Sequence, residues 1–376
     1  MRICFLAGSG SIHTRRWVSW FAQKGHDVHI VFPESIFSPY SIKVDGASLH
    51  PFRTMPIISP TSHLLLQPLD HWRVRHIIRR IKPDILHAHY LINYGFRAAC
   101  SGFHPLVLTA WGSDVLIVPK KSKISRWEVN FTLKRADLVT CGGEHMIGEL
   151  VKLGAGREKI KLIYFGIDTR KFSSRLRSEK LRKKLGILDS PAIISFRSLE
   201  PIYDVESLIK AIPSVLKEIP SAKFIVAGDG EQRKYLENLG VSLGISGSIR
   251  FVGFVENDEL PQYLVSADVY VSTSLSDAGI AVSTAEAMAC GLPVVITDFG
   301  DNRKWVENGI NGFLVPPKSP EALASKIAYL LRNEDDRIRF GQANRQIIKE
   351  KNSYEGEMEK MGKLYEELIE RYRRCG

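Results

Sequence analysis

The sequence has few of the features that mark secreted, zinc-binding or membrane-spanning proteins. Its five cysteines are scattered over the 376 residues, and no two of them form a CxxC pair. This spacing argues against a disulfide framework or a zinc site and indicates reduced thiols in the cytoplasm. No basic segment followed by a long apolar run opens the chain, so no secretory signal is expected. No run of about 18 apolar residues occurs, so we expect no helix that spans a bilayer.

A complete dinucleotide-binding fingerprint is also missing. Gly8-Ser9-Gly10 follows the first expected strand, but His13 stands where GxGxxG requires its last glycine. Gly228-Asp229-Gly230 fails the same test, because Arg233 occupies that position. A lone GxG is a weak signal for NAD, so a dehydrogenase is disfavoured. Glycines after a strand allow either a tight turn or a close approach by a substrate phosphate, and both alternatives stay open for Gly8, Gly10, Gly228 and Gly230.

The net charge of +11, from 52 basic and 41 acidic residues, bounds the partners of the protein. Much of the excess lies in three clusters, at 120–127, 175–184 and 371–374. Basic clusters bind nucleic acid or anionic lipid, or are simply solvated. No nucleic-acid module accompanies them, so we expect no nucleic-acid partner. Solvated surface and a peripheral contact with an anionic membrane surface, through the first cluster, both stay open.

Both halves of the chain alternate short β-branched runs with amphipathic helical stretches, a pattern typical of βαβ units and parallel sheets. In the first half we expect strands at 2–7, 28–32, 85–89, 106–110 and 138–141, with helices at 14–24 and 70–81. In the second half we expect strands at 192–196, 224–227, 249–252, 269–272, 294–297 and 313–315, with helices at 205–219, 232–239, 321–332 and 335–374. The predicted fold class is therefore α/β, with two doubly wound Rossmann-like domains facing across a cleft.

Changes in composition place the domain boundaries. Residues 1–172 form the first expected domain and 191–352 the second, because the charged segment 173–190 lacks apolar strand runs and suits a linker. Residues 353–376 are expected to form a C-terminal helix that packs back toward the first domain. Ligands of doubly wound sheets bind outside the carboxyl ends of the strands, so we expect both domains to present those loops to the cleft.

Residues 274–316 carry the most informative pattern. Asp277 opens a glycine-containing turn, a helix of small residues with Glu286 follows, and Gly291-Leu292-Pro293 leads into an apolar strand. Such a unit presents backbone N–H groups at a helix N-terminus, where the unpaired donors and the helix dipole stabilise a phosphate. Glu286 is either solvated or, because its neighbours are small and apolar, packed where it accepts hydrogen bonds from sugar hydroxyls. A phosphate site beside a hydroxyl acceptor is what a nucleotide-sugar needs.

Further candidates lie at the ends of other expected strands. His87 and His89 point to one face of their strand and suit a metal site, structural hydrogen bonds or the cleft, with His89 the stronger cleft candidate. No third metal ligand accompanies them. Asp114 either caps a turn or contacts a substrate. Arg197 ends the first strand of the second half, where its guanidinium binds phosphate oxygens or forms a surface ion pair. His13 is placed to reach the cleft.

In this order, the motifs resemble the retaining glycosyltransferases of family 4, which have the GT-B fold, over almost the full chain. In the first half the resemblance rests on 11–17, 25–28, 87–89, 112–114 and 166–168 with Phe172. In the second half it rests on Arg197, 228–230 and 286–295. Each motif is short, but their order and spacing together are specific.

The resemblance implies a nucleoside-diphosphate sugar as donor, retention of configuration at the anomeric carbon, and no essential metal or other cofactor. It places the diphosphate at Arg197 and the nucleotide ribose at Glu286. The implied donor-binding set is Gly8, Gly10, Arg197, Gly228, Gly230, Gly279, Ile280, Ala281, Val282 and Glu286. The catalytic candidates are Asp277, Glu286, His89 and Asp114. The acceptor side, in the first domain, is expected to use His13, Arg15 and Trp111.

One departure from the family pattern concerns its paired acids. These are usually two glutamates with seven residues between them, but the position eight residues before Glu286 is Ala278, and Asp277 lies one step earlier. Either a one-residue bulge brings Asp277 into place, or the contact with the sugar is altered.

Two further departures affect the same reaction. A lysine normally accompanies the diphosphate-binding arginine, but the corresponding loop here offers Tyr203-Asp204, so one cation is missing unless Arg303 or Lys304 substitutes. Trp111 stands where family members often carry histidine. These changes leave the predicted fold intact and weaken any statement about which sugar is transferred.

The sequence therefore predicts a glycosyltransferase that moves a sugar from a nucleoside-diphosphate sugar to a glycan or lipid-linked acceptor. We expect it in the cytoplasm, peripheral at the inner face of the cell membrane. Arg197 and the amides near Gly279 would stabilise the departing diphosphate. Two alternatives use the same fold, a nucleotide-sugar epimerase and a non-catalytic nucleotide-sugar-binding protein. Turnover of the donor without an acceptor would distinguish the epimerase.

Overall fold

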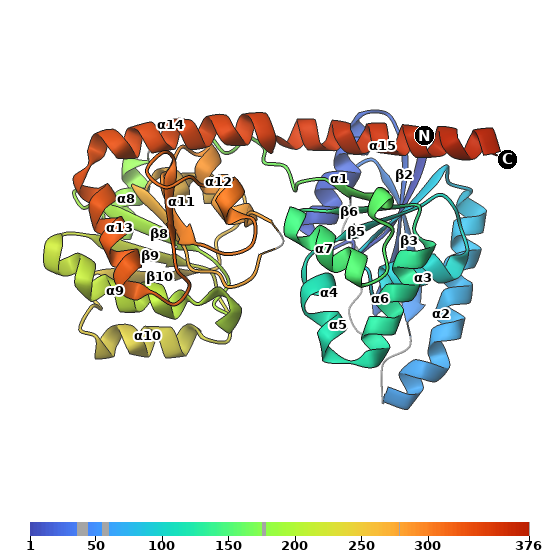
Figure 1. Ribbon diagram of the computed structural model, residues 1–376, viewed down its shortest axis with the longest axis horizontal. Helices are drawn as coiled ribbons and strands as arrows, with labels where there is room; N and C mark the ends of the chain where they lie inside the picture. The colour runs from blue at the N-terminus through green and yellow to red at the C-terminus, as the bar shows by residue number, and fades with distance from the viewer. Residues whose placement is uncertain (36–43, 55–59, 175–177, 278, 376) are drawn as a thin grey trace. The chain divides into compact units, whose positions relative to one another are not determined.

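The computed structural model describes residues 1–35, 44–54, 60–174, 178–277 and 279–375. These residues divide into two compact units, Met1–Tyr164 with Glu357–Gly376 and Phe165–Gly356. Figure 1 shows that each unit has its own sheet with helices packed around it. Within the described ranges, no helix is both long enough and apolar enough to cross a membrane.

The sheet of the first unit has, among the described residues, seven parallel strands in the order β3-β2-β1-β4-β5-β6-β7. Their bounds are β1 Arg2–Leu6, β2 Asp27–Ser35, β3 Ala47–Thr54, β4 Ile85–His89, β5 Leu106–Ala110, β6 Leu138–Cys141 and β7 Ile160–Leu162. β4 and β5 are buried along their whole length, as expected for parallel strands covered on both faces. The strand order reverses between β1 and β4, and their carboxyl ends flank the place where such sheets bind ligands.

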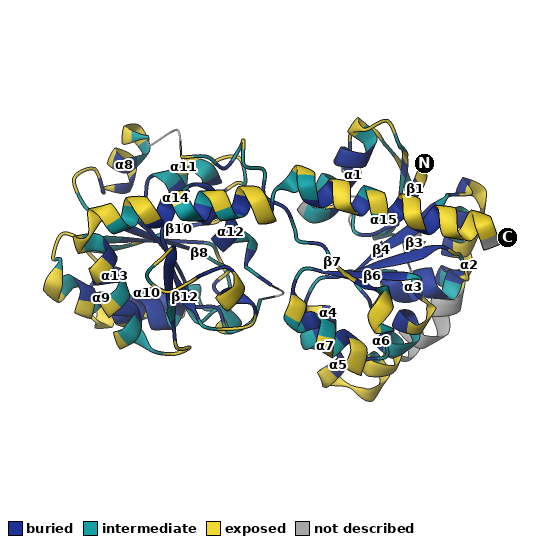
Figure 2. Ribbon diagram, turned by 45° about the horizontal axis from the view of Figure 1, so that its top comes forward, coloured by how far each residue is buried: buried dark blue, intermediate teal, exposed yellow. Residues whose placement is uncertain are grey.

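The helices of the first unit cover this sheet. They are α1 Ile12–Gln23, α2 Pro60–Ile81, α3 Tyr94–Ser101, α4 Ser113–Leu116, α5 Val118–Lys121, α6 Lys123–Arg135, α7 Glu144–Lys152 and α15 Tyr354–Cys375, with a 3-10 turn η1 Arg157–Lys159. Figure 2 shows α15 with exposed and buried stripes along its length. Met358, Met361 and Tyr365 form its buried face, and the Tyr365 ring stacks on Phe21 of α1 with centroids 5.1 Å apart. The C-terminal helix therefore completes the core of the N-terminal unit.

The second unit has, in its described part, a parallel sheet of six strands in the order β10-β9-β8-β11-β12-β13. Their bounds are β8 Ala192–Phe196, β9 Lys223–Ala227, β10 Ile249–Gly253, β11 Val269–Ser272, β12 Val294–Thr297 and β13 Gly312–Val315. The order reverses between β8 and β11. This sheet therefore repeats the doubly wound pattern of the first one.

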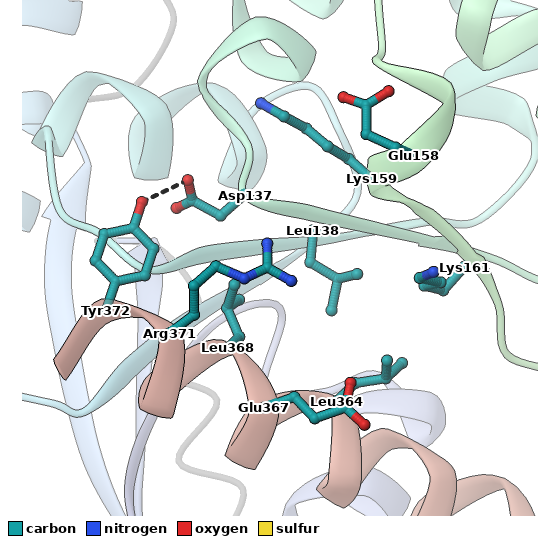
Figure 3. A pocket seen from close by; sticks show the side chains of 10 residues that line it. All are labelled: Asp137, Leu138, Glu158, Lys159, Lys161, Leu364, Glu367, Leu368, Arg371 and Tyr372. Atoms are coloured by element: carbon teal, nitrogen blue, oxygen red, sulfur yellow. Dashed lines mark hydrogen bonds between the residues drawn. The ribbon is translucent and has the colours of Figure 1, made fainter. Parts of the chain in front are cut away.

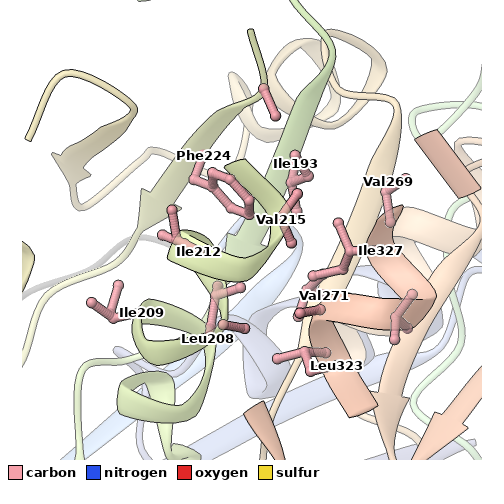
Figure 4. Close-up of a cluster of buried hydrophobic side chains, with 14 of the residues drawn as sticks. Ile193, Leu208, Ile209, Ile212, Val215, Phe224, Val269, Val271, Leu323 and Ile327 are labelled. Carbon is pink, nitrogen blue, oxygen red and sulfur yellow. The ribbon is translucent and has the colours of Figure 1, made fainter. Parts of the chain in front are cut away.

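The helices of the second unit bury apolar residues at helical spacing. They are α8 Glu179–Leu185, α9 Val205–Glu218, α10 Arg233–Ser242, α11 Leu260–Val265, α12 Val282–Ala289, α13 Pro320–Arg332 and α14 Glu334–Lys351, with 3-10 turns η2 Pro201–Tyr203 and η3 Asn302–Lys304. In the core drawn in Figure 4, α9 contributes Leu208, Ile212 and Val215, which share a cluster with Phe224 of β9 and Ile327 of α13. Burying each such side chain contributes about 1.5–3 kcal/mol, so this cluster holds α9 and α13 on the sheet.

The predicted α/β architecture of two parallel-sheet domains is confirmed, and two differences have physical reasons. β3 and β7 were not predicted, because β3 mixes polar residues with Pro51, and β7 is short and contains an exposed lysine. The helical stretch predicted at 335–374 is interrupted, because α14 ends at Lys351 and α15 begins at Tyr354. Between them, Asn352 Oδ1 accepts a hydrogen bond from Gly166 N–H at 2.9 Å, which anchors the break.

Candidate functional site

Polar residues gather where the strand order of the second unit reverses. Arg197 directly follows β8, and Ser274 and Asp277 lie on the loop that follows β11. α12 begins a few residues later, at Val282. Because β8 and β11 are neighbours at the reversal, these loops occupy the position where a doubly wound sheet binds its ligand.

Arg197 is the centre of this cluster. Its Nη2 donates to Asp277 Oδ1 at 2.6 Å and to Ser274 Oγ at 3.2 Å. Its Nη1 lies 3.5 Å from Ser283 Oγ, in the first turn of α12. The guanidinium also lies over the ring of Tyr203, 4.2 Å from the ring centroid, which is a cation–π contact. The end of β8, the loop after β11 and the start of α12 therefore hold the Arg197 guanidinium in place.

The ion pair of Arg197 and Asp277 is largely shielded from water, because the two side chains are 9% and 15% exposed. Burial lowers the pKa of Arg197, but the charge of Asp277 raises it, and the net result is a raised pKa. The guanidinium therefore stays charged. Its Nε–H is buried and has no hydrogen-bond partner among the described residues. A buried unpaired donor is costly, so a phosphate oxygen would be stabilised at this atom.

α12 adds backbone donors and a buried carboxylate to the cluster. Its first main-chain hydrogen bond runs from Ala285 N–H to the Ala281 carbonyl, so the N–H groups of its first turn have no partner inside the helix. Such groups stabilise an anion. Glu286 is 5% exposed, so it is packed rather than solvated, as the small neighbouring residues suggested. Gly279 precedes the helix with φ of +123°, a conformation that favours glycine.

The glycines of the second GxG segment bring two loops together. A Cβ atom on Gly228, where φ is +126°, would lie 2.0 Å from the carbonyl oxygen of Arg197. A Cβ atom on Gly230 would lie 2.6 Å from the carbonyl oxygen of Leu199. Both glycines are therefore required by the packing of this loop against the Arg197 loop, and direct contact with a donor stays a prediction for them.

In the first unit, a chain of buried hydrogen bonds ties the histidine strand to the C-terminal helix. Tyr365 Oη lies 2.5 Å from His87 Nδ1, and His87 Nε2 lies 2.7 Å from Thr109 Oγ1. Thr109 Oγ1 lies 2.7 Å from Thr140 Oγ1, which donates to the Leu108 carbonyl at 3.4 Å. Because a carbonyl only accepts, the chain runs from the Tyr365 hydroxyl to Nδ1 and from Nε2–H to Thr109. His87 is thus a fully bonded structural histidine, whose pKa burial lowers.

His13, His89 and Trp111 are brought together at the carboxyl ends of β4 and β5 and the start of α1. The ring of His13 stacks on Trp111 with centroids 4.8 Å apart, and His89 meets Trp111 edge-on at 5.4 Å. His89 Nδ1 lies 3.3 Å from Thr14 Oγ1. Burial, with a smaller effect from Arg16, lowers the pKa of His13 to about 4. Burial, followed by the charge of His13, lowers the pKa of His89 to about 3, so both rings are neutral near pH 7.

Asp114 is completely buried, and both its carboxylate oxygens accept backbone hydrogen bonds. Oδ2 accepts from Leu91 N–H at 2.9 Å, and Oδ1 accepts from Trp111 N–H at 3.0 Å and Gly112 N–H at 2.9 Å. Burial raises the pKa of Asp114 to about 6 against the opposing effect of these bonds. The geometry matches the turn-capping alternative, and a contact with substrate stays a prediction.

The other predicted residues of the first unit lie near the same strand ends. A Cβ atom on Gly8 would lie 3.1 Å from Tyr94 Oη, and Gly10 is exposed. Arg15, on α1, is half-buried, and its Nε–H has no hydrogen-bond partner in the described part of the chain. Among the described residues, no group of three or more His, Cys, Asp or Glu side chains could hold a metal ion.

The structure shows something different at each of the positions that depart from the family pattern. Ala278 lies outside the described residues. Tyr203 places its ring, rather than a lysine, beside Arg197. Arg303 Nε donates to Asp298 Oδ1 at 2.6 Å, and the Arg303 side chain is 75% exposed. Arg303 is thus paired with Asp298 in this structure, and a role at the diphosphate stays a prediction for it.

A cavity of about 620 Å³ lies at the other end of the first sheet (Figure 3). It is lined by Asp137, Leu138, Glu158, Lys159, Lys161, Leu364, Glu367, Leu368, Arg371 and Tyr372. Tyr372 Oη donates to Asp137 Oδ1 at 2.7 Å. The lining comes from the amino ends of β6 and β7 and from α15, whereas the predicted residues lie at carboxyl ends. This cavity is therefore separate from the candidate site.

Sequence reasoning missed several residues that the structure places at the site. Ser274 and Ser283 contact Arg197, and Tyr270 Oη donates to Ser283 Oγ at 2.8 Å. Tyr365 was missed because it joins the site region from the C-terminal helix. The position of Ser274 just after a strand and of Ser283 in the first turn of a helix was a usable signal.

Comparison with known proteins gives two matching family models. Residues 2–142 match the model described as "Glycosyl transferase 4-like", and residues 177–347 match "Glycosyl transferases group 1". The two matches follow one another along the chain, one in each half.

Relatives of similar length align with nearly the whole chain. An uncharacterised glycosyltransferase of Methanocaldococcus jannaschii is 26% identical over 336 residues, which cover 85% of this chain and 84% of the relative. The N-acetyl-alpha-D-glucosaminyl L-malate synthase of Bacillus anthracis is 23% identical over 365 residues, covering 92% and 90%. Among solved structures, Anabaena HepE in complex with UDP has a TM-score of 0.82 and 23% identity, covering 98% of this chain and 100% of that one.

Proposed function

Since the chain belongs to the family 4 glycosyltransferases of the GT-B fold, it is a transferase that uses a nucleotide-sugar donor, and we propose that it retains the configuration of the transferred sugar. We further propose a glycan or a lipid-linked sugar as the acceptor. The observation that carries the proposal is the buried, charged Arg197 at the strand reversal of the second unit, with an unpaired Nε–H and the first turn of α12 close by. This arrangement suits the diphosphate of a sugar nucleotide.

The proposed reaction follows from the charge that develops on the diphosphate. The bond between the anomeric carbon and the diphosphate oxygen breaks, and its electron pair stays on the oxygen. Arg197 and the first-turn N–H groups of α12 stabilise this charge without reorganising. The acceptor hydroxyl bonds to the anomeric carbon from the same face, and its proton passes to a phosphate oxygen. Atoms and charge balance, so the reaction needs no protein base.

The remaining residues support recognition of the sugars. Glu286 is buried and close in sequence to the phosphate-binding turn, which supports a role as acceptor of hydrogen bonds from the nucleotide ribose. In the first unit, the partly exposed rings of His13 and Trp111 stack at the strand ends, and the buried His89 lies against Trp111. His89 Nε2 is buried and lacks a hydrogen-bond partner among the described residues. A surface of apolar rings with a few polar atoms suits the acceptor sugar.

A thermal-shift screen with UDP-, GDP- and ADP-sugars tests the donor. UDP-sugars come first, because HepE was solved with UDP and with UDP-glucose. A bound donor should raise the melting temperature, and more so the tighter it binds. The coupling of the anomeric proton in the product then tests retention. The donor proposal is wrong if no sugar nucleotide stabilises the protein, and retention is wrong if the product has the inverted configuration.

We also propose that the first unit contacts an anionic membrane through α5 and α6. Ile124 and Trp127 are 68% and 57% exposed, and four exposed basic residues surround them, Lys120, Lys121, Lys123 and Arg126. Apolar residues flanked by cations suit an interface with anionic lipid. Sedimentation with anionic vesicles should retain the wild type and lose the Trp127→Ser variant. Trp72→Ser, at a position 63% exposed on α2, is the control, and equal sedimentation of both variants would contradict the contact.

A further inference from the structure

The ion pair between Arg197 and Asp277 joins two residues that the reaction needs separately. Arg197 is proposed to bind the diphosphate, and Asp277 is the acidic residue nearest the position that contacts the sugar in the family pattern, yet Nη2 and Oδ1 lie 2.6 Å apart. Among the described residues, Arg197 is the one group that donates a hydrogen bond to the Asp277 side chain. Carboxylate and phosphate oxygens use the same N–H groups of a guanidinium. The diphosphate and Asp277 therefore compete for Arg197.

Resting on the proposed function, we propose that Asp277 is a displaceable partner of Arg197, which makes the site favour a sugar nucleotide over the nucleoside diphosphate that remains after transfer. The donor's diphosphate takes the guanidinium from Asp277. The freed carboxylate then accepts hydrogen bonds from hydroxyls of the sugar to be transferred. After transfer these hydroxyls leave with the product, Asp277 returns to Arg197, and the nucleoside diphosphate is released.

The burial of the pair gives this exchange its selectivity. The two side chains are 9% and 15% exposed, so either charge is unfavourable without a partner. A nucleoside diphosphate compensates Arg197 but leaves Asp277 without a hydrogen-bond donor. A complete sugar nucleotide compensates both groups, because the sugar supplies hydroxyl donors. Binding the sugar nucleotide therefore leaves no buried charge without a partner, whereas binding the nucleoside diphosphate leaves Asp277 without one.

The contacts of the two residues decide which of them moves. The guanidinium of Arg197 has further contacts with Ser274, Ser283 and the ring of Tyr203, which remain when Asp277 leaves. The Asp277 side chain has no second polar partner in the described part of the chain. Asp277 also lies on the loop between β11 and α12. Arg197 thus stays in place for the diphosphate, and the carboxylate is the group that exchanges partners.

Isothermal titration calorimetry of the Asp277→Asn variant tests the exchange. Asparagine keeps the shape of the side chain but removes the charge that competes with phosphate. We expect the variant to bind the nucleoside diphosphate about tenfold more tightly than the wild type, equivalent to about 1.4 kcal/mol. Its affinity for the matching sugar nucleotide should rise less, so the ratio between the two affinities narrows. The nucleoside diphosphates are UDP, GDP and ADP, and the matching sugar nucleotides are UDP-glucose, GDP-glucose and ADP-glucose.

Asp336→Asn is the control. Asp336 also lies in the second unit and pairs with an arginine, Arg339, so the variant removes the same charge from an arginine pair outside the candidate site. It should bind every nucleotide as the wild type does. If Asp277→Asn also binds nucleoside diphosphate like the wild type, the exchange is overturned and the transferase proposal stands. If the wild type binds neither nucleotide form, the proposed function fails, and the exchange fails with it.

A second measurement uses only the wild type and does not depend on the folding of a variant. In a crystal structure with the sugar nucleotide, Asp277 should be out of hydrogen-bonding distance of Arg197 and within that distance of a sugar hydroxyl. With the nucleoside diphosphate, the density of Asp277 should divide between the two positions. An ion pair between Arg197 and Asp277 that stays intact in the complex with the sugar nucleotide would overturn the proposal.

Discussion

Replacing Tyr365 by phenylalanine should destabilise the first unit more than its small chemical change suggests. The variant removes the hydroxyl that donates to His87 Nδ1, and both side chains are completely buried. No water replaces the lost donor at such a position, so His87 keeps an unsatisfied acceptor. Leaving a buried polar group unsatisfied costs about 1–3 kcal/mol. For a unit of this size, each kcal/mol lowers the melting temperature by about 2–4 °C, so a decrease of about 2–12 °C is expected.

Tyr372→Phe provides the matched comparison on the same helix. It removes the same atom, and Tyr372 Oη also donates a hydrogen bond, to Asp137 Oδ1 at 2.7 Å, but the side chain is 37% exposed. Water can replace that bond, so a change within about 0.5 kcal/mol is expected. Differential scanning calorimetry of both variants measures the difference. Equal losses of stability would refute the argument that burial of the Tyr365–His87 bond sets its value.

Three further predictions concern the transfer site, the glycine loop and the response to acid. Arg197→Lys should lower kcat about 100- to 1000-fold in a transfer assay, because a lysine loses the planar set of donors to the diphosphate. Gly228→Ala should melt several degrees below Gly244→Ala, since both positions have positive φ but only the first is crowded. The free energy of unfolding, measured in urea, should fall as the pH drops below about 6.5, because the unfolded chain protonates His13 and His89 while the fold keeps them neutral.

Each of these predictions has a control and an outcome that contradicts it. Arg339→Lys alters an exposed ion pair and should leave kcat unchanged, so an equal loss in both lysine variants would exclude a special role for Arg197. Equal melting of the two alanine variants would show that crowding of the new Cβ atom against the Arg197 carbonyl is unimportant. Asp114 has the opposite effect on the free energy of unfolding. Burial raises its pKa to about 6 in the folded protein, so it stabilises the fold at low pH, and this stabilisation is lost as the pH rises through about 6. Asp114→Asn should therefore steepen the decline in acid, and an unchanged profile would contradict the assignment.

The central strands were predictable because their chemistry is local. β5, β8, β11 and β12 are short, mainly apolar runs, often β-branched, and the structure bounds them as the sequence predicted. β3 was missed, since its residues ASLHPFRT fit the edge of a sheet only when β2 is already in place. The helical periodicity of 335–374 does not show the break between α14 and α15, for a similar reason. The hydrogen bond of Asn352 to Gly166 N–H joins positions far apart in the chain, and periodicity carries no sign of it.

The candidate site was predictable residue by residue but not in its contacts. Arg197 was identified from its place after a strand, with a surface ion pair as the alternative, whereas the structure shows a buried pair. Its partner Asp277 is 80 positions along the chain, and the conformation of its loop decides that contact. The capping alternative for Asp114 was visible from the adjoining turn, because that interaction is local. Tyr365, by contrast, lies 278 positions from His87.

The C-terminal helix belongs to the first unit, and this affects the order in which the two units can fold during synthesis. The chain passes from the first unit to the second after Tyr164 and returns at Glu357, so a segment translated after the whole second unit supplies Met358, Met361 and Tyr365 to the core that earlier residues began. On the ribosome, the second unit has all its residues before the first unit does. Domains usually mature in the order of their translation, and here that order is inverted. A chain released before α15 is translated would contain a folded second unit and a first unit whose core lacks the buried side chains of α15.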